Sequence, residues 1–409
     1  GRDDAACSAI KRLAASNGSL AAEEKQRALV MTALCAALDG KPATASLAAA
    51  MLRDGGIKAA AALAALDALA GKDVAASPTD AILSVADVRL AALAGRTIDP
   101  GMFSRATPAA LIAAVDSREL ADESRLAAAE AAASLSLIEP VALAKVYGRA
   151  ELDPSLLADP QSSGLDGAPL RALQFRALRA ASDDRRRIDL ARQLIASAGQ
   201  ALAIPLAILL QPQFEGLQPT SELAEFSETA IEINLLAGDY AAANRWAVAG
   251  SQAMPSAGGD FVHWMMLINI ADPDAVAERQ PALKLTEDLA LAGRLTPALL
   301  HRLICVLDAL EYDIPVPLWD AASRTPQPID GHLPATGRLA ELQAAAQSRN
   351  QSRTLLLSII ALGPAGAADA NLLSLGDTIR ALRAAGLAAE ARRIGLEALY
   401  PLWPRHDAS

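Results

Sequence analysis

GRAELDP, at residues 148–154, combines the signals that end one helix with those that begin the next. Gly148 suits the left-handed conformation that terminates helices, and Asp153 suits a helix cap. Pro154 then suits the first helical position, because its missing N–H costs nothing there. Two similar joints, GRTIDP and GRLTP, occur at residues 95–100 and 293–297. The reuse of this joint predicts a series of helices connected by short turns.

The composition also favours helices over strands. Hydrophobic residues make up 52% of the 409 residues, but aromatic residues make up only 3%. Alanine has the highest helix propensity and a small side chain, so this composition is typical of closely packed helices. We therefore predict an all-α fold with no β-sheet and more than about 60% helix. Antiparallel helical hairpins are expected to stack into an α-solenoid.

Two stretches rich in turn-forming residues divide the chain, which is too long for one ordinary core. The polar segment 159–169 predicts a linker between an N-terminal helical array, 1–158, and a middle helical array, 170–322. The Pro-rich segment 323–337 predicts a loop before a C-terminal helical bundle, 338–409.

Charge and hydropathy argue against two classes of partner. The net charge of -10 opposes binding to nucleic acid, which requires clustered Lys and Arg. The most apolar stretch, 201–210, is about half the length of a membrane span and contains Pro205, so we expect no transmembrane segment. The chain begins at Gly1 without an initiator Met, which fits a processed mature form or a trimmed chain.

The three cysteines, Cys7, Cys35 and Cys305, form no C-x-x-C pair, so a zinc site is not expected. A helical hairpin that turns at residues 17–19 would place Cys7 beside Cys35, which predicts a disulfide between them. The alternative is two buried thiols that pack as small hydrophobic side chains, as we expect for Cys305. A disulfide would favour a periplasmic or exported protein, and free thiols a cytoplasmic one.

The sequence contains no recognisable catalytic motif, so we expect neither an enzyme nor a cofactor or metal site. It has no G-x-S-x-G element and no phosphate-binding loop, and its histidines are far apart. Glu123-Ser124 is similar to the Glu-Ser pair of lytic transglycosylases, but the Gly-Leu-Met-Gln element of that family does not follow. The Glu123 carboxylate is better explained by the positive end of a helix dipole. The four histidines are His263, His301, His332 and His406.

LAGDYAAANRWA, at residues 236–247, resembles the second half of a tetratricopeptide repeat. Gly250 stands where that family usually has Ala, and Ser227 and Ile231 stand where a Trp and a Gly are expected. The segment 386–398 is similar but lacks the aromatic residue. The resemblance implies a degenerate helical repeat. The matching positions are Gly238, Tyr240, Ala243, Ala247 and Pro255.

The stretch around Cys7 and Cys35 also resembles uncharacterised exported helical proteins of high-GC bacteria, which implies a compartment and no activity. On this basis we expect a non-catalytic scaffold or adaptor that binds another protein in the bacterial cell envelope. One alternative is a helical carrier that encloses a small apolar molecule or lipid. A second is the helical accessory arm of a complex that modifies the cell wall.

Large side chains gather in one region of the middle array, which makes it the candidate binding surface. The adjacent residues Trp264, Met265 and Met266 cannot all face one direction on a helix, so at least one of them should point away from the local core. We therefore hypothesise a groove lined by Trp246 or Trp264. The alternative is a buried layer between successive hairpins. The candidate residues are Tyr240, Trp246, Phe261, His263, Trp264 and Met265.

Overall fold

The computed structural model describes residues 2–15, 22–54, 60–70, 82–253, 261–275 and 278–405. Helices account for 73% of this part of the chain, and it contains no β-strand beyond an isolated bridge between His332 and Ala370. The prediction of an all-α fold is therefore confirmed. The chain divides into two compact units, residues 1–209 and 210–409.

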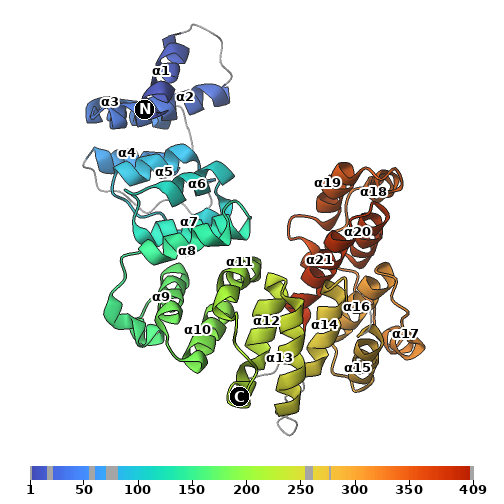
Figure 1. Cartoon of the computed structure of the whole chain (residues 1–409). Helices are drawn as coiled ribbons and strands as arrows, with labels where there is room; N and C mark the ends of the chain where they lie inside the picture. Colours follow the sequence, from blue (N-terminus) through green and yellow to red (C-terminus); the bar gives the residue numbers. More distant parts are fainter. Residues whose placement is uncertain are drawn as a thin grey trace. The chain divides into compact units, whose positions relative to one another are not determined.

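In the first unit, consecutive helices from α1 to α10 pack against each other along the chain (Figure 1). The predicted linker 159–169 lies within this unit, at η3 and the start of α9. The last helix, α11, reaches the boundary between the units. The elements are α1 (Arg2–Ala15), α2 (Ala22–Leu38), α3 (Pro42–Asp54), α4 (Ala60–Leu69), α5 (Val85–Leu93), η1 (Pro100–Arg105), α6 (Pro108–Asp116), α7 (Asp122–Ser134), α8 (Pro140–Arg149), η2 (Pro154–Leu157), η3 (Pro160–Ser163), α9 (Gly167–Ala180), α10 (Asp184–Ala196) and α11 (Gln200–Leu210).

The second unit also contains helical pairs, such as α12 with α13 and α18 with α19, but it folds back on itself. Helix α21 packs against α14 and α16, and α20 packs against α16. A simple solenoid has contacts only between sequence neighbours, so this unit departs from that pattern. Its elements are η4 (Gln211–Gln213), η5 (Ala224–Phe226), α12 (Ser227–Ala237), α13 (Tyr240–Ala253), η6 (Phe261–His263), α14 (Trp264–Ala271), α15 (Arg279–Leu291), α16 (Pro297–Ala309), α17 (Val316–Ser323), α18 (Arg338–Gln347), α19 (Gln351–Leu362), η7 (Ala367–Asp369), α20 (Leu372–Ala384), α21 (Ala388–Leu399) and η8 (Tyr400–Leu402).

Two of the three recurrent joints adopt the predicted conformation. Gly95 and Gly293 have φ angles of 62° and 69°, which only glycine adopts at little cost. The side chains of Asp99 and Thr296 accept hydrogen bonds from backbone N–H groups in the first turns of η1 and α16. Each cap is followed by a proline at the first helical position, so the capping chemistry is as expected.

The third joint differs at its glycine. Gly148 lies inside α8, which continues through Arg149 and is capped by Ala150 in an extended conformation. The prediction of a left-handed terminator at Gly148 is therefore wrong, because the helix ends one residue later without one. The second half of the joint behaves as predicted, since Asp153 caps η2 and Pro154 begins it.

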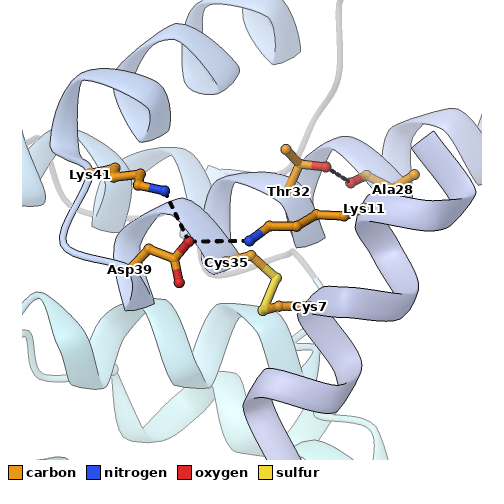
Figure 2. The surroundings of a disulfide bond; sticks show 7 residues. All are labelled: Cys7, Lys11, Ala28, Thr32, Cys35, Asp39 and Lys41. Atoms are coloured by element: carbon orange, nitrogen blue, oxygen red, sulfur yellow. Dashed lines mark hydrogen bonds and ion pairs between the residues drawn. A yellow bond between two sulfur atoms is a disulfide. The ribbon is translucent and has the colours of Figure 1, made fainter. Parts of the chain in front are cut away.

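Helices α1 and α2 are joined by a disulfide between Cys7 and Cys35, whose α-carbons lie 5.5 Å apart (Figure 2). The predicted turn at residues 17–19 lies outside the described residues. Near the bridge, Asp39 accepts a hydrogen bond from Lys11 at 3.3 Å and another from Lys41 at 3.4 Å. These hydrogen bonds, the one from Lys11 first, lower the pKa of the exposed Asp39 carboxyl.

Within the described residues, no helix combines the length and the apolar character needed to cross a membrane.

Candidate functional site

The large side chains singled out in the sequence lie on α13, η6 and α14 of the second unit, and most of them are buried. Trp246 is 2% exposed and Trp264 is fully buried. Both tryptophans thus complete a core layer, which is the alternative that the sequence left open. Phe261 and His263 are buried as well, whereas Tyr240 and Met265 are half-buried.

Trp264 and His263 of this layer form polar contacts within the protein. The indole N–H of Trp264 donates to Glu228 at 3.0 Å. His263 Nε2 lies 2.9 Å from the carbonyl oxygen of Pro404 and 4.0 Å from the Glu228 carboxylate. These contacts connect α14 to α12 and to the C-terminal segment, which is a structural role.

A second set of contacts fastens the C-terminal segment to α12. Arg405 Nε donates to Glu232 at 2.8 Å, and the Tyr400 hydroxyl donates to the same carboxylate oxygen at 3.3 Å. The Arg405 guanidinium also lies 4.8 Å from the centre of the Tyr400 ring. Burial raises the pKa of the Glu232 carboxyl, and the ion pair with Arg405 opposes this rise.

An open groove of about 720 Å³ lies in the first unit, where η1 and α7 face the starts of α9 and α11. Apart from Phe103, its apolar lining consists mainly of small and medium side chains, including Ala127, Ala131, Pro169 and Leu202. Alanine dominates this stretch of α7, so the helix leaves room instead of filling the space. The groove is therefore a consequence of the Ala-rich composition.

Three carboxylates stand at the edge of this groove: Asp99, Glu123 and Asp166. All three residues are exposed. Asp99 accepts a hydrogen bond from the backbone N–H of Gly101 at 2.8 Å, but no Lys or Arg among the described residues forms an ion pair with any of the three. The groove edge therefore carries uncompensated negative charge.

The Glu130 carboxylate holds the elements around the groove together. It accepts hydrogen bonds from Arg171 Nε at 2.8 Å and from the Tyr147 hydroxyl at 2.7 Å. Arg171 also pairs with the second Glu130 oxygen and donates to the Ser197 carbonyl oxygen at 2.8 Å. Burial, more than the nearby Glu130, raises the pKa of Tyr147 well above its usual value. The Glu130–Arg171 pair is electrically neutral, so it makes the groove rigid without changing its charge.

A smaller hollow of about 360 Å³ extends the groove along η1 and shares Asp99, Pro100 and Glu123 with it. Asp87 and Arg96 also line this hollow, but both are used structurally. Asp87 closes the capping box of α5, and Arg96 donates to a backbone carbonyl of α4 at 3.3 Å. Asp99 and Glu123 therefore line both hollows, whereas Asp166 lines only the larger groove.

Sequence reasoning missed this groove, although it had assigned local roles to two of its residues. Asp99 was expected only to cap a helix, and Glu123 only to interact with a helix dipole. Asp166 lies in the predicted linker 159–169, to which no binding role was given. The available signal was that several capping carboxylates recur at joints. Their convergence depends on how the helices pack, which spacing along the chain does not reveal.

Other reactive groups of the described chain are held in structural roles. The Cys305 thiol donates to the Leu372 carbonyl oxygen at 3.2 Å, and burial raises its pKa to about 11, so little thiolate forms near neutral pH. Within the described residues, no group of three or more His, Cys, Asp or Glu side chains is arranged to hold a metal ion.

Comparisons of the chain with protein-family models, with curated proteins and with solved structures give no match.

Proposed function

We propose that this protein is a non-catalytic helical adaptor that holds an extended, basic segment of a partner protein in the groove of the first unit. One observation carries the proposal: the groove of about 720 Å³ has three exposed carboxylates at its edge, and no cation of the described chain is paired with them. Such an edge attracts Lys and Arg side chains and repels acidic ones.

The lining of the groove complements the same kind of segment. Lys and Arg place their aliphatic carbons on apolar surface while their charged ends stay in water. Ala127, Ala131 and Leu202 offer such a surface close to the carboxylates. Because Glu130 and Arg171 hold α7 and α9 in place, little order has to be gained on binding, which favours affinity.

The dimensions favour a segment rather than a folded surface. A volume of about 720 Å³ accommodates a few side chains, and the adjoining hollow of about 360 Å³ lets a chain continue along η1. A partner segment in extended conformation would place alternate side chains in the groove and in solvent.

The test neutralises the groove edge without changing its shape, in a triple variant that combines Asp99→Asn, Glu123→Gln and Asp166→Asn. The Asn at position 99 keeps a side-chain oxygen to cap η1. The matched control neutralises three exposed carboxylates of the same unit outside the groove, with Asp116→Asn, Glu139→Gln and Glu151→Gln.

Binding is measured by calorimetry with short peptides that alternate Lys or Arg with small apolar residues, and with acidic peptides of the same length. The groove variant is expected to bind basic peptides at least about tenfold more weakly, with less dependence on salt. The control is expected to retain the affinity of the unchanged protein. Equal weakening in both variants, or equal binding of acidic peptides, would reject the groove as the site.

The helical-repeat interpretation is supported locally by the hairpin of α12 and α13. Gly238 ends α12 with a φ angle of 89°, and Ala243 and Ala247 are fully buried on α13. Small residues at these positions let the two helices approach, as the resemblance to a tetratricopeptide repeat implies. Repeats of this type present extended surfaces, which suits an adaptor.

The disulfide between Cys7 and Cys35 supports a periplasmic or exported location, because such bonds persist in oxidising compartments. When the protein is isolated from its host without reductant and then denatured, we expect a thiol assay to detect one free thiol per chain, that of Cys305. Detection of three thiols would favour the cytoplasm instead.

A further inference from the structure

Three arginines converge on a pocket of about 280 Å³ in the second unit. The pocket is lined by the starts of α15 and α21, the end of α20 and the residues that follow α16. Among the described residues, one carboxylate lines it, so its charged side chains sum to +2, from three guanidinium groups and one carboxylate, in a chain of net charge -10. The lining residues are Arg279, Leu310, Glu311, Arg383, Ala388 and Arg392.

A buried tyrosine beneath the pocket positions two of these arginines. The guanidinium of Arg279 lies over the ring of Tyr312, 4.6 Å from its centre. Arg392 Nη1 lies 3.3 Å from the Tyr312 hydroxyl and donates to the carbonyl oxygens of Asn269 and Ile270 at the end of α14. The like charges of Arg279 and Arg392 are therefore held near each other by packing, although no carboxylate of the described chain pairs with either.

The hydrogen-bonding capacity of these arginines is not used up. Arg279 Nε is buried and has no hydrogen-bond partner among the described residues. Arg392 makes all of its hydrogen bonds in the described chain through Nη1. Because Arg279 lines the pocket and its guanidinium forms no hydrogen bond within the described chain, its remaining N–H groups can donate to an acceptor supplied from outside.

The single carboxylate of the pocket is weakly held. Glu311 follows α16 in a left-handed conformation, and its side chain is 76% exposed. It pairs with Arg383, whose hydrogen bonding lowers the Glu311 pKa. Ion pairs between exposed groups contribute little stability, so an incoming anion can take the place of Glu311 beside Arg383.

The start of α21 adds a further favourable element. Ala388 is the first residue of this twelve-residue helix and lines the pocket, and the preceding Leu387 supplies no side-chain cap. The first N–H groups of the helix therefore have no capping side chain, and they lie at the positive end of the helix dipole beside Ala388.

We propose that this pocket binds a phosphate group, either as inorganic phosphate or as part of a small phosphate monoester. Guanidinium groups form strong, paired hydrogen bonds with phosphate oxygens, and a phosphate dianion would offset the excess charge of the pocket. The volume of about 280 Å³ is at the lower limit for small-molecule sites, which suits an anion of this size. The site lies in the second unit, so its test is independent of the peptide groove.

The experiment titrates the full chain with inorganic phosphate and separately with glycerol phosphate, in calorimetry at an ionic strength held constant with chloride. Arg279→Gln removes a guanidinium that forms no hydrogen bond within the described chain, and we expect at least about tenfold weaker binding, or about 1.4 kcal/mol. Glu311→Gln removes the competing carboxylate and is expected to tighten binding several-fold. Arg294→Gln, at an exposed arginine of the same unit outside the pocket, is the matched control and should leave the affinity unchanged.

Binding of either ligand with this pattern of variants supports the site, and the ligand that binds more tightly identifies the form it takes. No binding of either ligand up to about 10 mM would overturn the proposal. Equal weakening by Arg279→Gln and Arg294→Gln would also overturn it, because the attraction would then be general. A melting curve for each variant shows that a loss of binding does not reflect unfolding.

Discussion

At the residue scale, the burial of the tryptophans decides between a structural and a binding role. Trp246 is 2% exposed on α13, whereas Trp319 is 46% exposed on α17. We predict that Trp246→Ala lowers the free energy of unfolding by about 3 to 5 kcal/mol, because it leaves a cavity in the core layer. Trp319→Ala should change it by less than about 1 kcal/mol. Urea unfolding followed by circular dichroism measures both.

A small and equal effect of the two substitutions would contradict a core role for Trp246. If Trp246→Ala instead left stability unchanged but abolished binding of a partner, the groove that we hypothesised from the sequence would regain support.

At the element scale, Gly250 determines how closely α13 approaches α12. A Cβ atom at this position would meet the side chain of Ser227 and would lie 2.8 Å from Cδ2 of Phe261. This crowding explains why glycine stands where the resembling repeat has alanine. We predict that Gly250→Ala lowers the melting temperature, since overpacking costs about 1 to 3 kcal/mol and exceeds the gain in helix propensity of about 1 kcal/mol.

Gly148 provides the matched control for this prediction. It also lies within a helix, but a Cβ atom added there would meet no atom within 4 Å. Gly148→Ala should therefore raise the melting temperature, because alanine stabilises a helix by about 0.5 to 1 kcal/mol relative to glycine. A shift of the same sign in both variants would contradict the crowding at Gly250.

At the scale of the folded molecule, the ion pair of Glu232 with Arg405 joins α12 to a segment far along the chain. Glu232 is 9% exposed, whereas the side chain of Arg405 is 39% exposed. We predict that Arg405→Gln lowers the free energy of unfolding at pH 7 by about 1 to 3 kcal/mol, because it leaves a buried carboxylate without its cation. Glu232→Gln should lower the free energy of unfolding by less, since water can solvate the Arg405 guanidinium that is left without a partner. Urea unfolding of the two variants measures the difference.

The decrease in the free energy of unfolding caused by Arg405→Gln should also depend on pH. Burial already raises the pKa of folded Glu232, and loss of the cation raises it further. A raised carboxyl pKa means that the contribution to stability is fully present below the unfolded pKa, about 4.3, and is lost as the pH rises through the folded pKa. The deficit of the variant should therefore be smaller at about pH 4.5 than at pH 7. A deficit that does not change with pH would show that Glu232 is not its cause.

The features that could be predicted from the amino-acid sequence are those set by neighbouring residues. Helix propensity is a property of each residue, so the Ala-rich composition was sufficient to predict an all-α fold. Capping involves residues within one turn, which is why the joints at Gly95 and Gly293 were predicted correctly. The error at Gly148 was equally local, because glycine permits a left-handed turn but does not require one.

Which side chains are buried and which converge became clear only from the packing of the helices. The pattern of Trp246 and Trp264 fitted both a groove and a core layer. Helical periodicity shows on which face of a helix a side chain lies, but not whether another element covers that face. Arg279 and Arg392 meet above Tyr312 because α21 folds back onto α14 and α16. Contacts between helices distant in sequence depend on the packing of whole faces, and no local pattern of residues specifies them.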